Sequence, residues 1–306
     1  MQILYFFESI RNPVLDAFFS FITHFGEESI FIVLALFLFW CVDKYEGYYV
    51  LSVGFLGTLI NQALKIMFRI ERPWVKDPNF TIVESARAEA TGYSFPSGHT
   101  QSSVGNFGSI LKYGTKNRII NFICYSLCIL VPISRLYLGV HTIYDVVVSV
   151  TIALILIFVI HPIILKAKEN PKIMWAFLAV MTLISLILVI YISVYNFPEN
   201  TDKDNLEHAV GNFYKLFGAV IGMCLVYFVD TKYINFKTEA TTLGHVLKLV
   251  LGLVIVLAIK SGLKVAFNML FDYTPILDSI RYFVLIVVAG NVWPLTFKKL
   301  SVIGKK

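Results

Sequence analysis

Charged residues are scarce in this chain: they make up 15% of its 306 residues, whereas hydrophobic residues make up 57%. The mean hydropathy is +0.73, and long apolar runs recur along the sequence. A water-soluble globular protein has neither feature. The net charge of +6 does not indicate nucleic acid binding, because the basic residues are scattered between apolar runs and form no basic stripe. The composition therefore predicts a polytopic membrane protein whose anionic partners are lipid headgroups.

Cysteine is also rare, with four residues in the whole chain. All four lie inside apolar runs, and their spacing is that of neither a metal site nor a disulfide framework, so we expect small buried hydrophobes. The cysteines are Cys41, Cys124, Cys128 and Cys224.

A basic N-terminal region and a small-residue cleavage site are both missing from residues 1–25, which argues against a removable signal peptide.

Hydropathy and helix breakers predict an all-α fold, a bundle of about nine transmembrane helices plus a short N-terminal helix. Residues 12–24 are too short for a full span and are expected to form an interfacial or partly buried helix. Residues 99–113 are polar, but their small residues and hydroxyl groups suit a helix enclosed by other helices, so they count as a span. The other eight expected spans are residues 28–42, 47–68, 118–133, 140–165, 173–196, 209–229, 243–270 and 279–297.

Three polar motifs interrupt the apolar helices within about eighty residues of one another. Alternation of the helices across the bilayer places all three on one side. The loops of the opposite side carry more lysines and arginines than the loops of this side, which makes the opposite side cytoplasmic by the positive-inside rule. The motifs are therefore expected outside the cytoplasm, in the cell membrane. They are Lys65-x6-Arg72-Pro73, Pro96-Ser97-Gly98-His99 and Ser134-Arg135-x5-His141-x3-Asp145.

The residue types in these motifs predict chemistry on a phosphate group. His141 and Asp145 are four residues apart, so on a helix the carboxylate can hold one imidazole nitrogen while the other attacks phosphorus. Lys65, Arg72 and Arg135 can neutralise phosphoryl oxygens, and the arginines can bind two oxygens at once. Ser97 and Gly98 begin a helix, so their free backbone N–H groups can face an anion. His99 can protonate the leaving group. The scheme requires no metal and no cofactor.

The three motifs together resemble the type 2 phosphatidic-acid phosphatase superfamily. The resemblance covers roughly residues 12–165 and implies a metal-independent lipid phosphatase. It implies that His141 is the nucleophile, Asp145 its orienting partner and His99 the general acid. It further implies that phosphate is bound by Lys65, Arg72, Ser97, Gly98 and Arg135. We therefore predict a catalytic core in residues 1–168 and a four-helix transmembrane extension of unassigned role in residues 169–306.

The expected reaction is hydrolysis of a lipid phosphomonoester or diphosphate through a phosphohistidine intermediate. An isoprenoid diphosphate and a glycerophospholipid phosphate are equally compatible with the motifs. Two alternatives remain at this point: an activity like that of the vanadium haloperoxidases, and a phospholipid-binding transporter or scramblase. The motifs also have a structural reading, in which the cations snorkel to the interface and His141 and Asp145 form an ordinary helical pair.

The C-terminal helices carry a second, weaker cluster of cations. Lys260 and Lys264 are four residues apart, so they repel each other on a helix and favour a nearby anion. With Arg281, and with Lys215 as a further candidate, they predict a diphosphate or headgroup site beside the catalytic residues. The alternative is that these cations pair with Asp272, Asp278 or Glu207, or snorkel to the interface.

Overall fold

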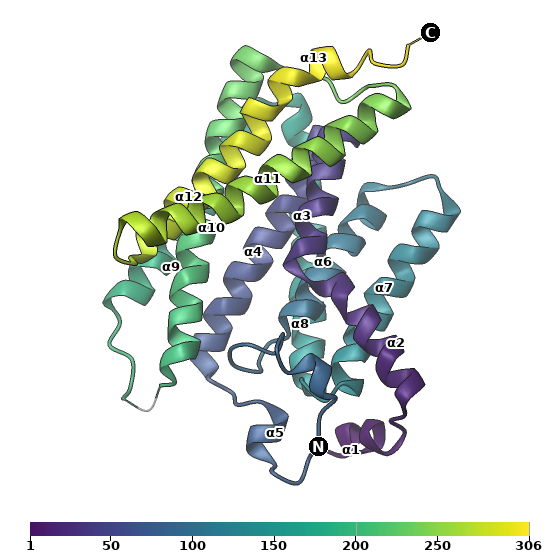
Figure 1. Cartoon of the computed structure of the whole chain (residues 1–306), viewed down its shortest axis with the longest axis vertical. Coiled ribbons are helices and arrows are strands. Elements are labelled where there is room, and N and C mark those ends of the chain that lie inside the picture. The colour runs from purple at the N-terminus through teal and green to yellow at the C-terminus, as the bar shows by residue number, and fades with distance from the viewer. Residues whose placement is uncertain (200, 306) are drawn as a thin grey trace. The chain divides into compact units, whose positions relative to one another are not determined.

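The computed structural model describes residues 1–199 and 201–305 of the chain (Figure 1). The chain is 80% helical, and the described residues contain no β-strand. Its contacts divide it into two compact units. Unit 1 comprises Met1–Ile32, Tyr49–Pro162 and Asn196–Ala209, and unit 2 comprises Val33–Tyr48, Ile163–Tyr195 and Val210–Lys306.

Unit 1 carries all three polar motifs. In it, helix α6 packs chiefly against α7, and α2 packs on the same helix (Figure 1). Most of α6 is buried, polar residues included, as expected for a polar helix enclosed by others. Its elements are α1 (Gln2–Ser9), α2 (Pro13–Thr23), η1 (His24–Gly26), the start of α3 (Glu28–Phe37), most of α4 (Lys44–Phe68), α5 (Pro73–Lys76), η3 (Glu84–Ala86), α6 (Gly98–Tyr113), α7 (Arg118–Tyr137) and most of α8 (Ile143–Glu169).

Unit 2 is built largely from the C-terminal helices. Within it, α11 packs against α12, and the indole nitrogen of Trp40 donates a hydrogen bond to the carbonyl of Ala289 at 2.9 Å. Lys44 and Asp230 form an ion pair at 2.6 Å. The further elements of this unit are η2 (Leu38–Val42), α9 (Pro171–Val194), most of α10 (Lys203–Val229), η4 (Asp230–Ile234), α11 (Thr242–Leu270), α12 (Pro275–Val287), η5 (Val288–Val292), η6 (Trp293–Thr296) and α13 (Phe297–Leu300).

Seven helical segments of the described chain are long and apolar enough to cross a membrane, so this is a multi-pass membrane protein. An eighth is possible if Pro13–Gly26 and Glu28–Val42, which meet at an angle of 51°, form one broken span. The predicted count of nine is not confirmed. Two differences account for this: α6 has 16 residues and is polar, and the span expected over residues 28–42 qualifies only together with Pro13–Gly26, as one half of a bent pair.

Candidate active site

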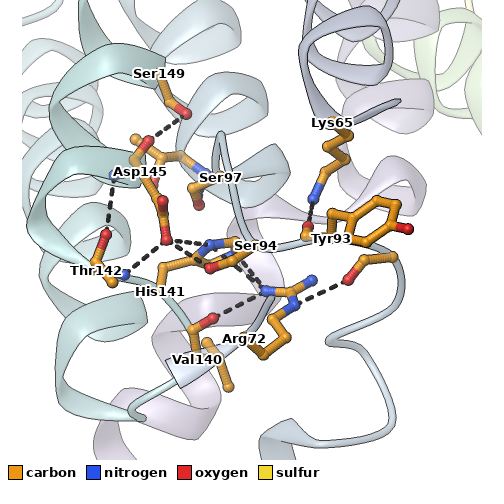
Figure 2. Close-up of polar contacts among 12 residues, drawn as sticks. Lys65, Arg72, Tyr93, Ser94, Ser97, Val140, His141, Thr142, Asp145 and Ser149 are labelled. Carbon is orange, nitrogen blue, oxygen red and sulfur yellow. Dashed lines mark hydrogen bonds and ion pairs between the residues drawn. The ribbon is translucent and has the colours of Figure 1, made fainter. Parts of the chain in front are cut away.

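The three motifs meet at four helix ends of unit 1 (Figure 2). Lys65 lies in the last turn of α4, and Ser97 caps the start of α6. Arg135 lies in the last turn of α7, and Asp145 in the first turn of α8. Side chains at helix ends can therefore converge although the helices themselves point in different directions.

The side chains of His141 and Asp145 lie close together and are each 2% exposed, with 3.4 Å between Nδ1 of the histidine and Oδ2 of the carboxylate. The other ring nitrogen, Nε2, lies 2.9 Å from Nη1 of Arg72. A guanidinium group can only donate, so Nε2 is the acceptor and the ring proton sits on Nδ1, facing Asp145. The lone pair of Nε2 is thus directed at a cation.

Asp145 is held by groups that sequence reasoning did not single out. Its Oδ2 accepts a hydrogen bond from the hydroxyl of Ser94 at 2.6 Å and another from the backbone N–H of Thr142 at 2.7 Å. The hydroxyl of Thr142 accepts in return from the N–H of Asp145 at 3.4 Å. Thr142 and Asp145 therefore form a capping box at the start of α8. The same oxygen of Asp145, Oδ2, therefore caps the start of α8 and faces Nδ1 of His141.

A tight turn places Arg135 and His141 next to each other. The carbonyl of Arg135 accepts hydrogen bonds from the N–H groups of Val140, at 3.2 Å, and His141, at 3.3 Å. Gly139 lies in this turn with a φ of +81°, a conformation that favours glycine. A side chain there would also approach Nη2 of Arg11 to 2.7 Å. This turn therefore explains why five residues separate Arg135 from His141 in the third motif.

Lys65 and Arg72 are both buried, and each donates to backbone carbonyls of the loop that precedes α6. Arg72 donates to the carbonyls of Thr91 at 2.6 Å and Gly92 at 3.1 Å, and it also reaches the carbonyl of Val140 at 2.9 Å. Lys65 donates to the carbonyl of Tyr93. Neutral carbonyl oxygens hold both cations, and Arg72 lies next to His141 (Figure 2).

Arg135 is completely buried and only partly satisfied. Its Nη1 donates to the hydroxyl of Thr23 at 2.6 Å. Its Nε and Nη2 are buried and have no hydrogen-bond partner among the described residues. A buried charge with unmet donors is costly, so this guanidinium group is suited to an anionic ligand with several acceptor oxygens.

Ser97, Gly98 and His99 form the start of α6. Ser97 is the N-cap, and its hydroxyl accepts from the N–H of Thr100 at 3.4 Å. The Nε2 atom of His99 is buried and has no partner among the described residues. His99 lies within electrostatic range of Arg135 and His141. Gly26 allows the close packing here, because a side chain on it would approach the carbonyl oxygen of His99 to 2.8 Å.

Charge is unevenly distributed in this site. The buried cations Lys65, Arg72 and Arg135 outnumber the single buried carboxylate, Asp145. Burial and the positive charge of Arg72 hold the pKa of His141 well below its ordinary value, although the contact with Asp145 acts in the opposite direction. The imidazole is therefore neutral at physiological pH. In the described part of the chain, no group of three or more His, Cys, Asp or Glu side chains could hold a metal ion.

The second predicted cluster lies in unit 2. Lys264 and Arg281 line one cavity together with Lys215, whereas Lys260 is not among the residues that line it. Arg281 forms an ion pair with Asp278 at 2.5 Å, which is one of the pairings that the alternative interpretation predicted.

Fold and site together define a class: a multi-pass helical membrane protein with a buried cationic site around a histidine and a carboxylate. Residues 46–169 match the PAP2 superfamily, and residues 214–305 match the transmembrane extension of PAP2 superfamily phosphatases. The chain belongs to the PAP2 superfamily. No solved structure matches it significantly.

Three curated relatives show how far the likeness extends. Phosphatidylglycerophosphatase B of Bacillus subtilis is 27% identical over 174 residues, which cover 52% of this chain and 80% of that protein. Undecaprenyl-diphosphatase BcrC of the same organism is 30% identical over 152 residues, covering 49% and 75%. Lipid A 4'-phosphatase of Porphyromonas gingivalis is 27% identical over 171 residues, covering 53% and 71%.

Proposed function

We propose that the chain removes a phosphate group from a phosphorylated membrane lipid through a phosphohistidine intermediate. The observation that carries the proposal is the environment of His141. One of its nitrogens faces Asp145, and the other faces Arg72, one of three buried cations. Membership of a family whose relatives are named as phosphatases supports the same reaction class.

In the first step, Nε2 of His141 attacks phosphorus while the bond between phosphorus and the lipid oxygen breaks. Asp145 stabilises the imidazolium character that develops on the ring. Arg72 turns from Nε2 to the incoming phosphoryl oxygens, and the unmet donors of Arg135 bind the same group. The bound anion offsets the cations around His99, so this imidazole can carry the proton that the leaving oxygen needs.

In the second step, water attacks the phosphohistidine. His99, now neutral, accepts a proton from the water molecule, and the phosphorus–nitrogen bond breaks. Inorganic phosphate leaves, and Nε2 of His141 regains its lone pair. The two steps transfer only a phosphoryl group and protons, and they return His141 and His99 to the states in which the reaction began.

The substrate class follows from the composition and the relatives. The relatives' names refer to phosphatidylglycerophosphate, undecaprenyl diphosphate and lipid A. These are phosphorylated amphiphiles, and helices long enough to span a bilayer suit a substrate that is itself embedded there. The distribution of lysines and arginines supports an active site on the extracytoplasmic side of the cell membrane.

The test is phosphate release by the purified chain in detergent. The panel is undecaprenyl diphosphate, phosphatidic acid, phosphatidylglycerophosphate and lysophosphatidic acid, each with and without a chelator. We expect release from at least one of the four lipids, and release that survives the chelator. Release from none of them, with the protein shown to be folded, would contradict the proposal. Lysophosphatidic acid added outside intact cells tests the sidedness, because cleavage there requires an outward-facing site.

Replacement of Ser94 tests whether its hydrogen bond positions Asp145. We expect Ser94→Ala to lower kcat about tenfold with KM nearly unchanged, because a buried hydrogen bond to a charged group is worth roughly 1.5–3 kcal/mol. Ser94→Thr keeps a hydroxyl group and should recover part of the rate. The measurement is steady-state phosphate release on the substrate that the panel selects.

Ser109→Ala is the matched control, because Ser109 is a buried serine that donates to the carbonyl of Gly105 at 2.6 Å and touches no group of the site. An equal loss of rate in the Ser94 and Ser109 variants would mean that Ser94 acts through general stability alone.

A further inference from the structure

A cavity of about 520 Å³ lies in unit 2, in the transmembrane extension. Three of its lining residues are cations, each on a different helix: Lys215 on α10, Lys264 on α11 and Arg281 on α12. The acidic lining residues are Asp272 and Asp278. The cavity is thus a polar space built by three membrane helices, and positive groups outnumber negative ones on its wall.

Arg281, which lines the cavity, has a buried hydrogen-bond donor that is not satisfied by the described residues. Its side chain is buried, and its Nη2 donates to Oδ1 of Asp278 at 2.5 Å. Its Nε is also buried but has no hydrogen-bond partner among the described residues. The other oxygen of Asp278 accepts from the hydroxyl of Tyr273 at 3.1 Å. The ion pair therefore leaves a guanidinium donor unmet, and buried donors are nearly always paired.

Gly211 on α10 lies beside these groups. A β-carbon at this position would lie 3.5 Å from Oδ2 of Asp278, 3.7 Å from the hydroxyl of Tyr273 and 3.9 Å from Nζ of Lys215. Polar atoms from three segments of unit 2 thus come within 4 Å of one point. Convergence of this kind is typical of a binding site.

The wall of the cavity is apolar in other places. Phe267, Phe271 and Leu277 line it together with the charged groups. Phe271 is 56% exposed, and the neighbouring Leu270 is 71% exposed. A ligand that matches both kinds of wall has an anionic head and an apolar tail.

We propose that this cavity binds the phosphate of an anionic lipid headgroup, as a second anion site separate from His141. Lys264 supplies a mobile ammonium group, and Arg281 supplies the free Nε–H to a phosphate oxygen. Phe267 and Phe271 contact the first carbons of the lipid chains. The proposal concerns binding, so it stands or falls independently of the reaction at His141.

Native mass spectrometry of the full chain in detergent, with phosphatidylglycerol added, tests this site. We expect Lys264→Gln to lower the retained lipid about tenfold, the factor that corresponds to loss of one charge-assisted contact. Because Lys264 is exposed, its replacement leaves the packing intact. Arg281→Lys keeps the charge but removes the Nε–H, and it should lower retention as well. Phosphatidylcholine, whose headgroup has no net charge, should be retained equally by all variants.

Lys299→Gln is the matched control, because it removes the same charge from an exposed lysine that does not line the cavity. A second arm measures binding of radiolabelled inorganic phosphate. Loss of phosphate binding in Lys264→Gln, with phosphatidylglycerol unaffected, would assign the same anion site to free phosphate and overturn the lipid as its ligand. Wild-type binding of both probes in Lys264→Gln and Arg281→Lys would overturn the site itself. Thermal unfolding of each variant confirms that the comparison is between folded proteins.

Discussion

Replacement of His141 by alanine should abolish lipid phosphate release, with kcat reduced by about five orders of magnitude or more. The reason is that no other side chain can form the covalent bond to phosphorus at this position. Arg72, which faces Nε2, is a permanent cation and cannot act as a nucleophile. Phosphate release measured over hours with high protein concentration gives the sensitivity that such a loss requires.

The control for this variant is His161→Ala. His161 is a histidine on α8 that packs against the rings of Tyr49 and Tyr113 and does not touch the site. It should keep wild-type turnover. If His141→Ala retained more than a small percentage of the wild-type rate, a phosphohistidine on this residue would be untenable. Trapping of a radiolabelled, acid-labile phosphoprotein in the wild type, and its loss in His141→Ala, is the direct measurement.

Asp145→Asn should lower kcat by about three to four orders of magnitude, by analogy with the neutral replacement of the aspartate in catalytic triads. The carboxylate holds the imidazole proton on Nδ1, and an amide NH2 in its place would favour the proton on Nε2. The attacking nitrogen would then have no lone pair. Binding of the lipid should change far less than turnover. The measurement therefore compares KM, which should stay close to the wild-type value, with kcat, which should fall.

Asparagine still accepts the N–H of Thr142, so the capping box and the start of α8 should survive in Asp145→Asn. An unchanged midpoint of thermal unfolding would confirm this. The control is Asp77→Asn, which alters an acceptor of the Tyr5 hydroxyl group away from the site. Turnover of Asp145→Asn close to that of Asp77→Asn would show that the carboxylate does not set the tautomer.

Much of this fold could be predicted from hydropathy alone, because a helix that crosses a bilayer must satisfy its own backbone and carry an apolar surface. The expected span over residues 118–133 corresponds to α7, and the one over residues 243–270 to α11. The polar helix α6 required a different argument, from small residues and hydroxyl groups. The expected boundary between residues 12–24 and 28–42 coincides with the bend between α2 and α3, but hydropathy gives no angle between two apolar segments.

For the site, the sequence predicted residue types better than contacts. His141, Asp145 and the three cations stand out because charge is rare in this chain. Ser94 and Thr23 do not, since hydroxyl residues occur throughout the sequence and only geometry shows which of them bind a charged group. Thr142 binds Asp145 through its backbone N–H, which gives no side-chain signal. The carbonyl groups that receive Lys65 and Arg72 carry no side-chain signal at all.

Under the proposed reaction, these carbonyl groups have a consequence for product release. When Lys65 and Arg72 are bound to main-chain oxygens between residues 91 and 93, the loop acts as an internal competitor for the same donors. A phosphate group must displace it to enter, and the loop regains its bonds as phosphate departs. The loop thereby opposes retention of the product by Lys65 and Arg72, and part of the affinity of the proposed site for phosphate is given up for faster turnover.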